Sequence, residues 1–96
     1  MKLWIDDVRP APERYIWIKT VNCALMFIST FDKEIELIDI DHDAGDCAAY
    51  GGDYIKILDW LEETGRSYPI RIHSMNPVGR ENMRVIIRRN NWIEVK

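Results

Sequence analysis

The length, composition and charge of this chain restrict both its architecture and its partners. Its 96 residues are enough for one compact domain and too few for two, so we treat residues 1–96 as a single domain. A hydrophobic content of 47% excludes a disordered chain, and a formal net charge of −3 argues against general DNA binding, which requires many Lys and Arg side chains.

The first half of the chain predicts three strands and one helix. Short runs at residues 2–5 and 15–19 contain the β-branched and aromatic residues typical of strands, and a proline-containing loop separates them. Residues 20–30 predict a helix that begins at Thr20. Residues 34–40 predict a third strand, and because it is apolar at odd and even positions, we expect helices on each side of it.

The second half of the chain predicts two helices and two strands. Residues 53–64 have apolar side chains at helical spacing and are followed by a glycine stop. Residues 68–74 predict a fourth strand, residues 76–91 a helix with an asparagine cap and a proline at its first position, and residues 92–95 a fifth strand. Alternating strands and helices are typical of a mostly parallel sheet, so we predict a three-layer α/β sandwich with five strands.

The beginning of the sequence and its cysteines indicate an intracellular protein. Acidic residues appear at Asp6 and Asp7 after only five residues, and no apolar run approaches the roughly 20 residues of a membrane span. Cys23 and Cys47 are too few for a disulfide scaffold and lack the spacing of zinc ligands. We expect a cytoplasmic protein without membrane association, and its oligomeric state stays open.

Polar side chains follow three of the predicted strands. They are Asp6 and Asp7 after the first strand, Asp41, His42 and Asp43 after the third, and His73, Ser74 and Asn76 after the fourth. Because the carboxyl ends of parallel strands meet at one edge, these clusters should lie together. Carboxylates without a cation repel one another, and oxygen ligands are those that Mg²⁺ prefers. We therefore predict a Mg²⁺ or Mn²⁺ site at Asp6, Asp7, Asp41 and Asp43.

The same clusters have simpler explanations. Asp6 and Asp7 would also suit a solvated strand end, a lone histidine is more often structural than catalytic, and Asn76 caps a helix whatever else it does. The alternating aspartates near residue 41 resemble a calcium loop. However, Ala44 replaces the turn glycine and Tyr50 the bidentate glutamate, so calcium is rejected.

The start of the predicted helix at residues 76–91 has the features of an anion site. A helix N-terminus presents free backbone N–H groups, Gly79 allows close approach, and Arg80 can form a bidentate contact with phosphate. We therefore predict phosphate binding there. The arginines further along this helix, Arg84 among them, are explained by a solvated face and by favourable placement near the helix C-terminus.

Three motifs, in order along the chain, resemble one known family. The segments "DDVRP", "DHD" and "HSMNPVGR" are similar to elements of the receiver domain of two-component signalling, and most closely resemble its branch called cyclic-phosphate processing receiver domains. The resemblance implies a flavodoxin-like or receiver-like sheet with a reduced helix set and a divalent cation held by Asp6, Asp7 and Asp41. It also implies a phosphate contact from Ser74, with His42 and His73 as added acid or base groups.

These observations lead to three hypotheses. The first is a Mg²⁺-dependent phosphoesterase or phosphotransferase that acts on a cyclic phosphate, carried by a phosphorylated small molecule or an RNA end, as in RNA repair. In it, Asp41 is a metal ligand or nucleophile, and His42 or His73 transfers protons. The phosphate would be held by Ser74, Asn76, Gly79, Arg80 and Arg9. The second hypothesis is a signalling receiver phosphorylated on Asp41, and the third is a non-catalytic pseudo-receiver binding module.

Overall fold

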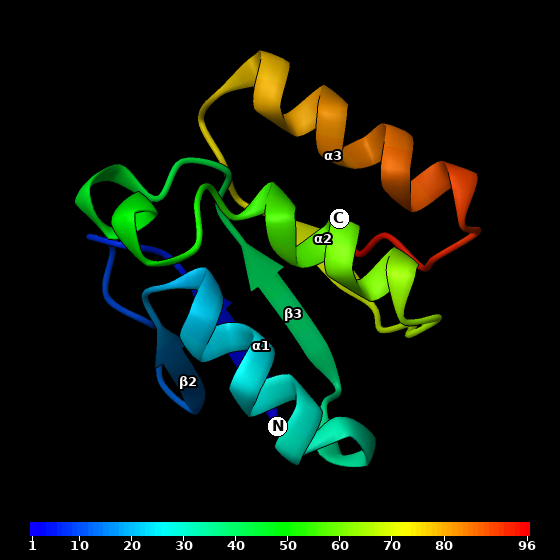
Figure 1. The fold of residues 1–96 in the computed structure, drawn as a ribbon, viewed down its shortest axis with the longest axis horizontal. Coiled ribbons are helices and arrows are strands. Elements are labelled where there is room, and N and C mark those ends of the chain that lie inside the picture. Colours follow the sequence, from blue (N-terminus) through cyan, green and yellow to red (C-terminus); the bar gives the residue numbers. More distant parts are fainter.

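The computed structural model describes residues 1–96 and contains a four-stranded parallel sheet (Figure 1). The strands, in the order β2-β1-β3-β4 across the sheet, are β1 (Lys2–Ile5), β2 (Tyr15–Ile18), β3 (Leu37–Ile40) and β4 (Ile70–Ile72). The helices are α1 (Val21–Thr30), α2 (Ile55–Glu63) and α3 (Pro77–Arg89), with short 3₁₀ helices at Asp32–Glu34 and Gly45–Tyr50. None of the helices has both the length and the apolar character needed to cross a bilayer. The predicted parallel α/β architecture is confirmed.

The helix ends follow the capping signals present in the sequence. The Thr20 side chain accepts a hydrogen bond from the Cys23 N–H (3.1 Å), and the Asn76 side chain accepts one from the Gly79 N–H (3.0 Å). Gly65 adopts a left-handed φ of 66° shortly after α2. Because these signals are local, the predicted helix boundaries agree with the observed ones to within two residues.

All three helices lie on one face of the sheet, so the molecule has two layers and the predicted three-layer sandwich is wrong (Figure 1). Helix α2 packs against both α1 and α3. The connections from β2 to β3 and from β3 to β4 run in the same direction across the sheet, and right-handed crossovers place their helices on the same face. The connection from β1 to β2 runs the opposite way, but it is a loop that forms no helix.

The two faces of the sheet therefore differ in composition. The face beneath the helices is apolar and contributes the buried residues Leu3, Ile5, Ile18, Ile38, Ile40, Ile70 and Ile72 to the core. The opposite face carries a row that crosses all four strands in register, formed by Trp17, Trp4, Asp39 and Arg71. Because side chains alternate along a strand, Asp39 points away from the helices. The expectation of helices on both sides of this strand is thus corrected.

The predicted fifth strand at residues 92–95 is also wrong. Only Glu94 forms a bridge, with Ile70 at the edge of the sheet. The Ile70 N–H donates to the Ile93 carbonyl (2.9 Å), and the Val95 N–H donates to the Ile70 carbonyl (2.8 Å). Because a single residue of β4 exchanges these hydrogen bonds, the segment adds a bridge to the sheet and no strand.

Candidate active site

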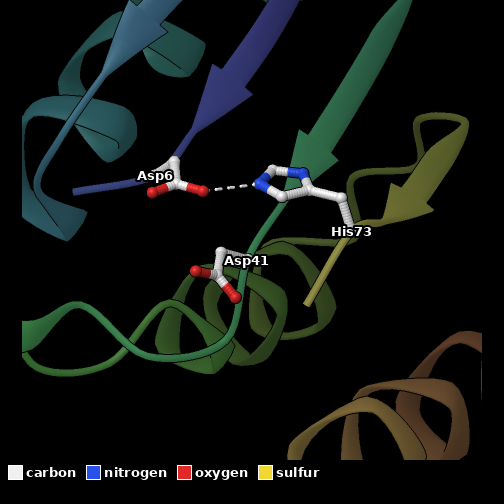
Figure 2. A group of neighbouring side chains, drawn as sticks. All are labelled: Asp6, Asp41 and His73. Atoms are coloured by element: carbon white, nitrogen blue, oxygen red, sulfur yellow. Dashed lines mark hydrogen bonds and ion pairs between the residues drawn. The ribbon is translucent and has the colours of Figure 1, made fainter. Parts of the chain in front are cut away.

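Three side chains from different strand ends meet at the carboxyl edge of the sheet (Figure 2). Asp6 follows β1, Asp41 follows β3 and His73 follows β4, and one potential ligand atom of each lies within 4.8 Å of the others. The parallel pairing of these strands aligns their ends, and this alignment brings the three residues together. We refer to Asp6, Asp41 and the adjacent Asp7 as the acidic cluster.

Both ring nitrogens of His73 face buried carboxylates. Nε2 lies 2.9 Å from Asp6 Oδ2, and Nδ1 lies 2.7 Å from Asp39 Oδ1. The side chains of Asp6 and Asp39 have no exposed surface. Two carboxylates that face the two ring nitrogens are both satisfied only by a ring that donates from each nitrogen. His73 thus links Asp6 at the rim of the sheet to Asp39 inside β3.

Asp6 combines burial with several hydrogen bonds. Its Oδ1 accepts hydrogen bonds from the N–H groups of Val8 and Arg9, each at 3.0 Å. Burial alone raises the pKa of Asp6. The hydrogen bonds from Arg9, Val8 and His73 together outweigh burial and hold that pKa below its usual range. Asp6 is therefore ionised at neutral pH.

Asp7 adds a third carboxylate beside Asp6 and Asp41. Its pKa is raised first by burial and then by the negative charges of Asp6 and Asp41. The loop after β3 approaches Asp7 so closely that a Cβ on Gly45 would lie 2.4 Å from Asp7 Oδ2. Carboxylate oxygens are the ligands that Mg²⁺ prefers, and Asp6 and Asp41, with His73, lie close enough together to hold one ion, while Asp7 adds negative charge beside them.

Asp43 was predicted as a metal ligand and lies in a second group, with His42 and Asp53. Its Oδ1 is 2.8 Å from His42 Nδ1, and its carboxylate also accepts hydrogen bonds from Asn76 Nδ2 at 3.3 and 3.4 Å. The His42 contact, helped by Asn76 and opposed by burial, holds the pKa of Asp43 below its usual range. His42 Nε2 forms no hydrogen bond within the protein, so His42 resembles a base oriented by a carboxylate.

The residues predicted to bind phosphate near the start of α3 form a hydrogen-bonded turn. Ser74 Oγ accepts a hydrogen bond from the Asn76 N–H (3.1 Å). Arg80 Nη1 donates to the Ser74 carbonyl (3.1 Å), and Arg9 Nη1 donates to the neighbouring His73 carbonyl (3.3 Å). Ser74 and Arg80 also line an open cleft of about 340 Å³, whereas Asn76 is occupied as a helix cap. Of this set, Ser74 and Arg80 line a surface hollow, and Ser74 itself is 1% exposed.

Gly79 allows a close approach of a side chain to α3. A Cβ at this position would lie 2.4 Å from His42 Cγ, and the Gly79 N–H is used by the Asn76 cap. Within the protein, the group that approaches Gly79 is the His42 ring, and the phosphate contact expected at Gly79 stays a prediction. The absence of a side chain at Gly79 leaves the space that this ring occupies.

We expect Gly79→Ala to lower the free energy of unfolding by about 1–3 kcal/mol, because the added methyl group must displace the His42 ring. Helix propensity alone would favour alanine, so a loss of stability would have to come from this contact. Urea denaturation measures the effect. The control Asn82→Ala changes an exposed position of the same helix and should alter stability by less than about 0.5 kcal/mol. A Gly79→Ala variant as stable as the wild type would contradict the contact.

Sequence reasoning did not assign Trp4 and Arg71, two residues that support the site together with Asp39. The Trp4 ring stacks on His73 with centroids 3.8 Å apart and an interplanar angle of 2°. Arg71 Nη1 lies 3.2 Å from Asp39 Oδ2. The available signal was an aspartate inside an otherwise apolar strand. Its partners depend on the register between β3 and β4, and no local pattern encodes that register.

The β2-β1-β3-β4 order and the polar residues at the strand ends define a receiver-like α/β domain. An acidic pair follows β1, an aspartate follows β3 and a serine follows β4. The chain belongs to the cyclic-phosphate processing receiver domain family, which matches residues 1–89. The resemblance inferred from the three motifs is thereby confirmed. No curated protein and no solved structure matches the chain significantly.

Proposed function

We propose that this domain is a Mg²⁺-dependent phosphoesterase that opens a cyclic phosphate on a nucleotide or an RNA end. The family is associated with cyclic-phosphate processing. One observation carries the proposal. Asp41 of the acidic cluster is followed in the chain by the hydrogen-bonded pair His42–Asp43, so candidate metal ligands and a candidate base lie next to each other. A cation held by Asp6, Asp7 and Asp41 would polarise a phosphoryl oxygen and stabilise the charge that develops there.

His42 is the proposed acid or base of this reaction. Asp43 orients the ring through Nδ1, and Nε2 remains able to exchange a proton. Water adds to phosphorus and loses a proton, one ester P–O bond breaks, and the released ribose oxygen gains a proton. His73 has both nitrogens engaged by carboxylates, so its proposed role is to hold Asp6 in place.

The phosphate itself would lie near Ser74 and Arg80. These two side chains line the same cleft, and the guanidinium of Arg80 keeps donors beyond the one that Ser74 accepts. An arginine stays charged at all physiological pH values and suits the binding of a phosphate in both ground and transition states. Arg80 is therefore proposed to bind the phosphate and His42 to transfer the proton.

A signalling receiver phosphorylated on Asp41 is the second candidate function. Asp41 follows the third strand, at the place where the resemblance to receivers puts the phosphoacceptor, and its side chain is half-buried at the rim. Such a protein would keep a phosphoryl group on Asp41 and would turn over no external substrate. A pseudo-receiver that only binds would do neither.

Incubation with Mg²⁺ and a 2′,3′-cyclic nucleotide tests the proposed activity. We expect the cyclic phosphorus NMR signal to be replaced by that of a monoester, and EDTA to stop the conversion. His42→Ala should lower turnover on the order of a hundredfold, the scale of losing a positioned acid or base. Asp46→Asn, at an exposed position of the Gly45–Tyr50 segment, is the control and should keep full activity. Ring opening that persists unchanged in EDTA, or that never occurs, would reject the proposal.

A further inference from the structure

A second cleft borders the acidic cluster. It has a volume of about 330 Å³ and lies between β4, α3 and the C-terminal segment. Its polar lining consists of Arg71, His73, Arg80, Arg84, Glu94 and Lys96, of which Arg80 and Arg84 also line the cleft at Ser74. His73 belongs to the wall of this cleft and also touches Asp6 of the acidic cluster. The two sites are therefore contiguous, and we call this hollow the basic cleft.

Positive charge is concentrated in the basic cleft, although the whole chain has a net charge of −3. Glu94 is the single acid of the lining, and two of the cations share it. Arg84 Nε lies 3.0 Å and Lys96 Nζ 3.2 Å from the same oxygen, Glu94 Oε2. Arg71 pairs with Asp39 at its base, and Arg80 contacts only a backbone carbonyl. An excess of positive charge remains inside the cleft.

The arginines of the basic cleft also retain unused hydrogen-bond donors. A guanidinium has five N–H groups, and the contacts within the protein use Nε of Arg84 and a single Nη1 of Arg80 and of Arg71. Arg84 is not the solvated side chain that its helical position predicted, because only 21% of it is exposed. By comparison, Arg88 is 65% exposed and pairs with Glu81 outside the cleft.

We propose that the basic cleft is an anion subsite that binds a second phosphate of the substrate while the reacting phosphate lies at the acidic cluster. Arginine donors of this kind match the oxygens of a phosphodiester group. A cyclic mononucleotide carries one phosphate and would leave the subsite empty, whereas an oligonucleotide end fills both sites. The substrate class is therefore an oligonucleotide with a terminal phosphate. The identity of the reacting group rests on the proposed function, but binding in the cleft requires no turnover.

The experiment compares two ligands that have no cyclic phosphate and cannot be turned over by ring opening. Uridine 3′-phosphate carries one phosphate, and the dinucleotide uridylyl-uridine 3′-phosphate carries two. Calorimetric titrations are done in Mg²⁺ at physiological ionic strength, which screens non-specific attraction. We expect the dinucleotide to bind on the order of tenfold more tightly, the scale of one hydrogen-bonded charged contact.

Variants assign this difference to the basic cleft. Lys96→Gln should remove most of the dinucleotide preference, on the order of tenfold, and leave uridine 3′-phosphate unaffected, because Lys96 lines the basic cleft and not the cleft at Ser74. The Lys96 side chain is 74% exposed, so this variant should fold as the wild type does. The control Arg88→Gln also removes one positive charge, outside the cleft, and should keep the preference.

The outcomes separate this inference from the proposed activity. Equal affinity for the two ligands would overturn the subsite, and so would equal losses in Lys96→Gln and Arg88→Gln, because general electrostatics would then explain the binding. A dinucleotide preference that depends on Lys96 would support the subsite even if no cyclic phosphate were opened. In that case the binding site stands and the phosphoesterase proposal fails.

Discussion

His73→Ala is expected to lower the free energy of unfolding by about 3–5 kcal/mol, the cost of removing one partner from a buried charged pair. Asp6 and Asp39 face the two nitrogens of this ring from 2.9 and 2.7 Å, and both are fully buried. Without the ring, two buried carboxylates lose the hydrogen-bonding group between them, and Trp4 loses its stacking partner. Urea denaturation in EDTA measures the loss and keeps divalent cations away from Asp6.

A rescue variant and a second histidine make this prediction specific. Adding Asp39→Asn to His73→Ala removes a buried charge whose remaining charged partner is Arg71, and it should recover part of the lost stability. His42→Ala should cost clearly less, because its partner Asp43 is 58% exposed and can be solvated by water. Similar losses in the two histidine variants, with no rescue by Asp39→Asn, would mean that the His73 pairs contribute no more than ordinary packing.

Asp41→Asn is expected to abolish detectable Mg²⁺ or Mn²⁺ binding and to lower metal-dependent turnover about a thousandfold. A bound cation contributes several kcal/mol of transition-state stabilisation, and each 1.4 kcal/mol corresponds to about a tenfold change in rate. The fold should survive, because an asparagine oxygen can still accept the His42 N–H now held by Asp41 Oδ1 at 2.7 Å. In EDTA the variant should be at least as stable as the wild type, since the charge of Asp41 repels Asp7.

Calorimetric titration with each metal measures this binding, and Asp46→Asn is again the control. Treatment with acetyl phosphate then separates a metal ligand from a phosphoacceptor. If mass spectrometry found a phosphoryl group retained on Asp41 of the wild type and absent from Asp41→Asn, the signalling receiver would replace the enzyme as the best-supported function. Undiminished metal binding by Asp41→Asn would instead show that the cation site does not depend on this residue.

Much of the fold was predictable because its signals are local. Thr20 and Asn76 cap helices through contacts with residues three positions later, and Gly65 ends the helical segment before it with its own backbone angle. The family was also accessible from the sequence, since three short motifs carry it. The number of strands could not be predicted from the sequence. The segment at residues 92–95 has a strand-like composition, but it forms a β-bridge with Ile70 alone.

The candidate site was also predictable only in part. The polar residues at strand ends were visible in the sequence, and parallel pairing brings Asp6, Asp41 and His73 together as expected. Asp43 turned away from this group toward His42, which sits against Gly79 of a distant helix. That arrangement depends on how α3 docks on the sheet, and the residues around position 43 carry no information about it.

The sequence by itself determined the α/β class, the helix ends, the family and the rim on which the chemistry collects, because backbone preferences and strand alternation act over a few neighbouring residues. The tertiary structure alone decided that the helices cover one face, that Asp39 and Trp4 share the other face with His73, and that Arg84 lines a cleft. These features depend on crossover direction and strand register. Both are settled only when segments far apart in the chain pack together and bury their apolar surface.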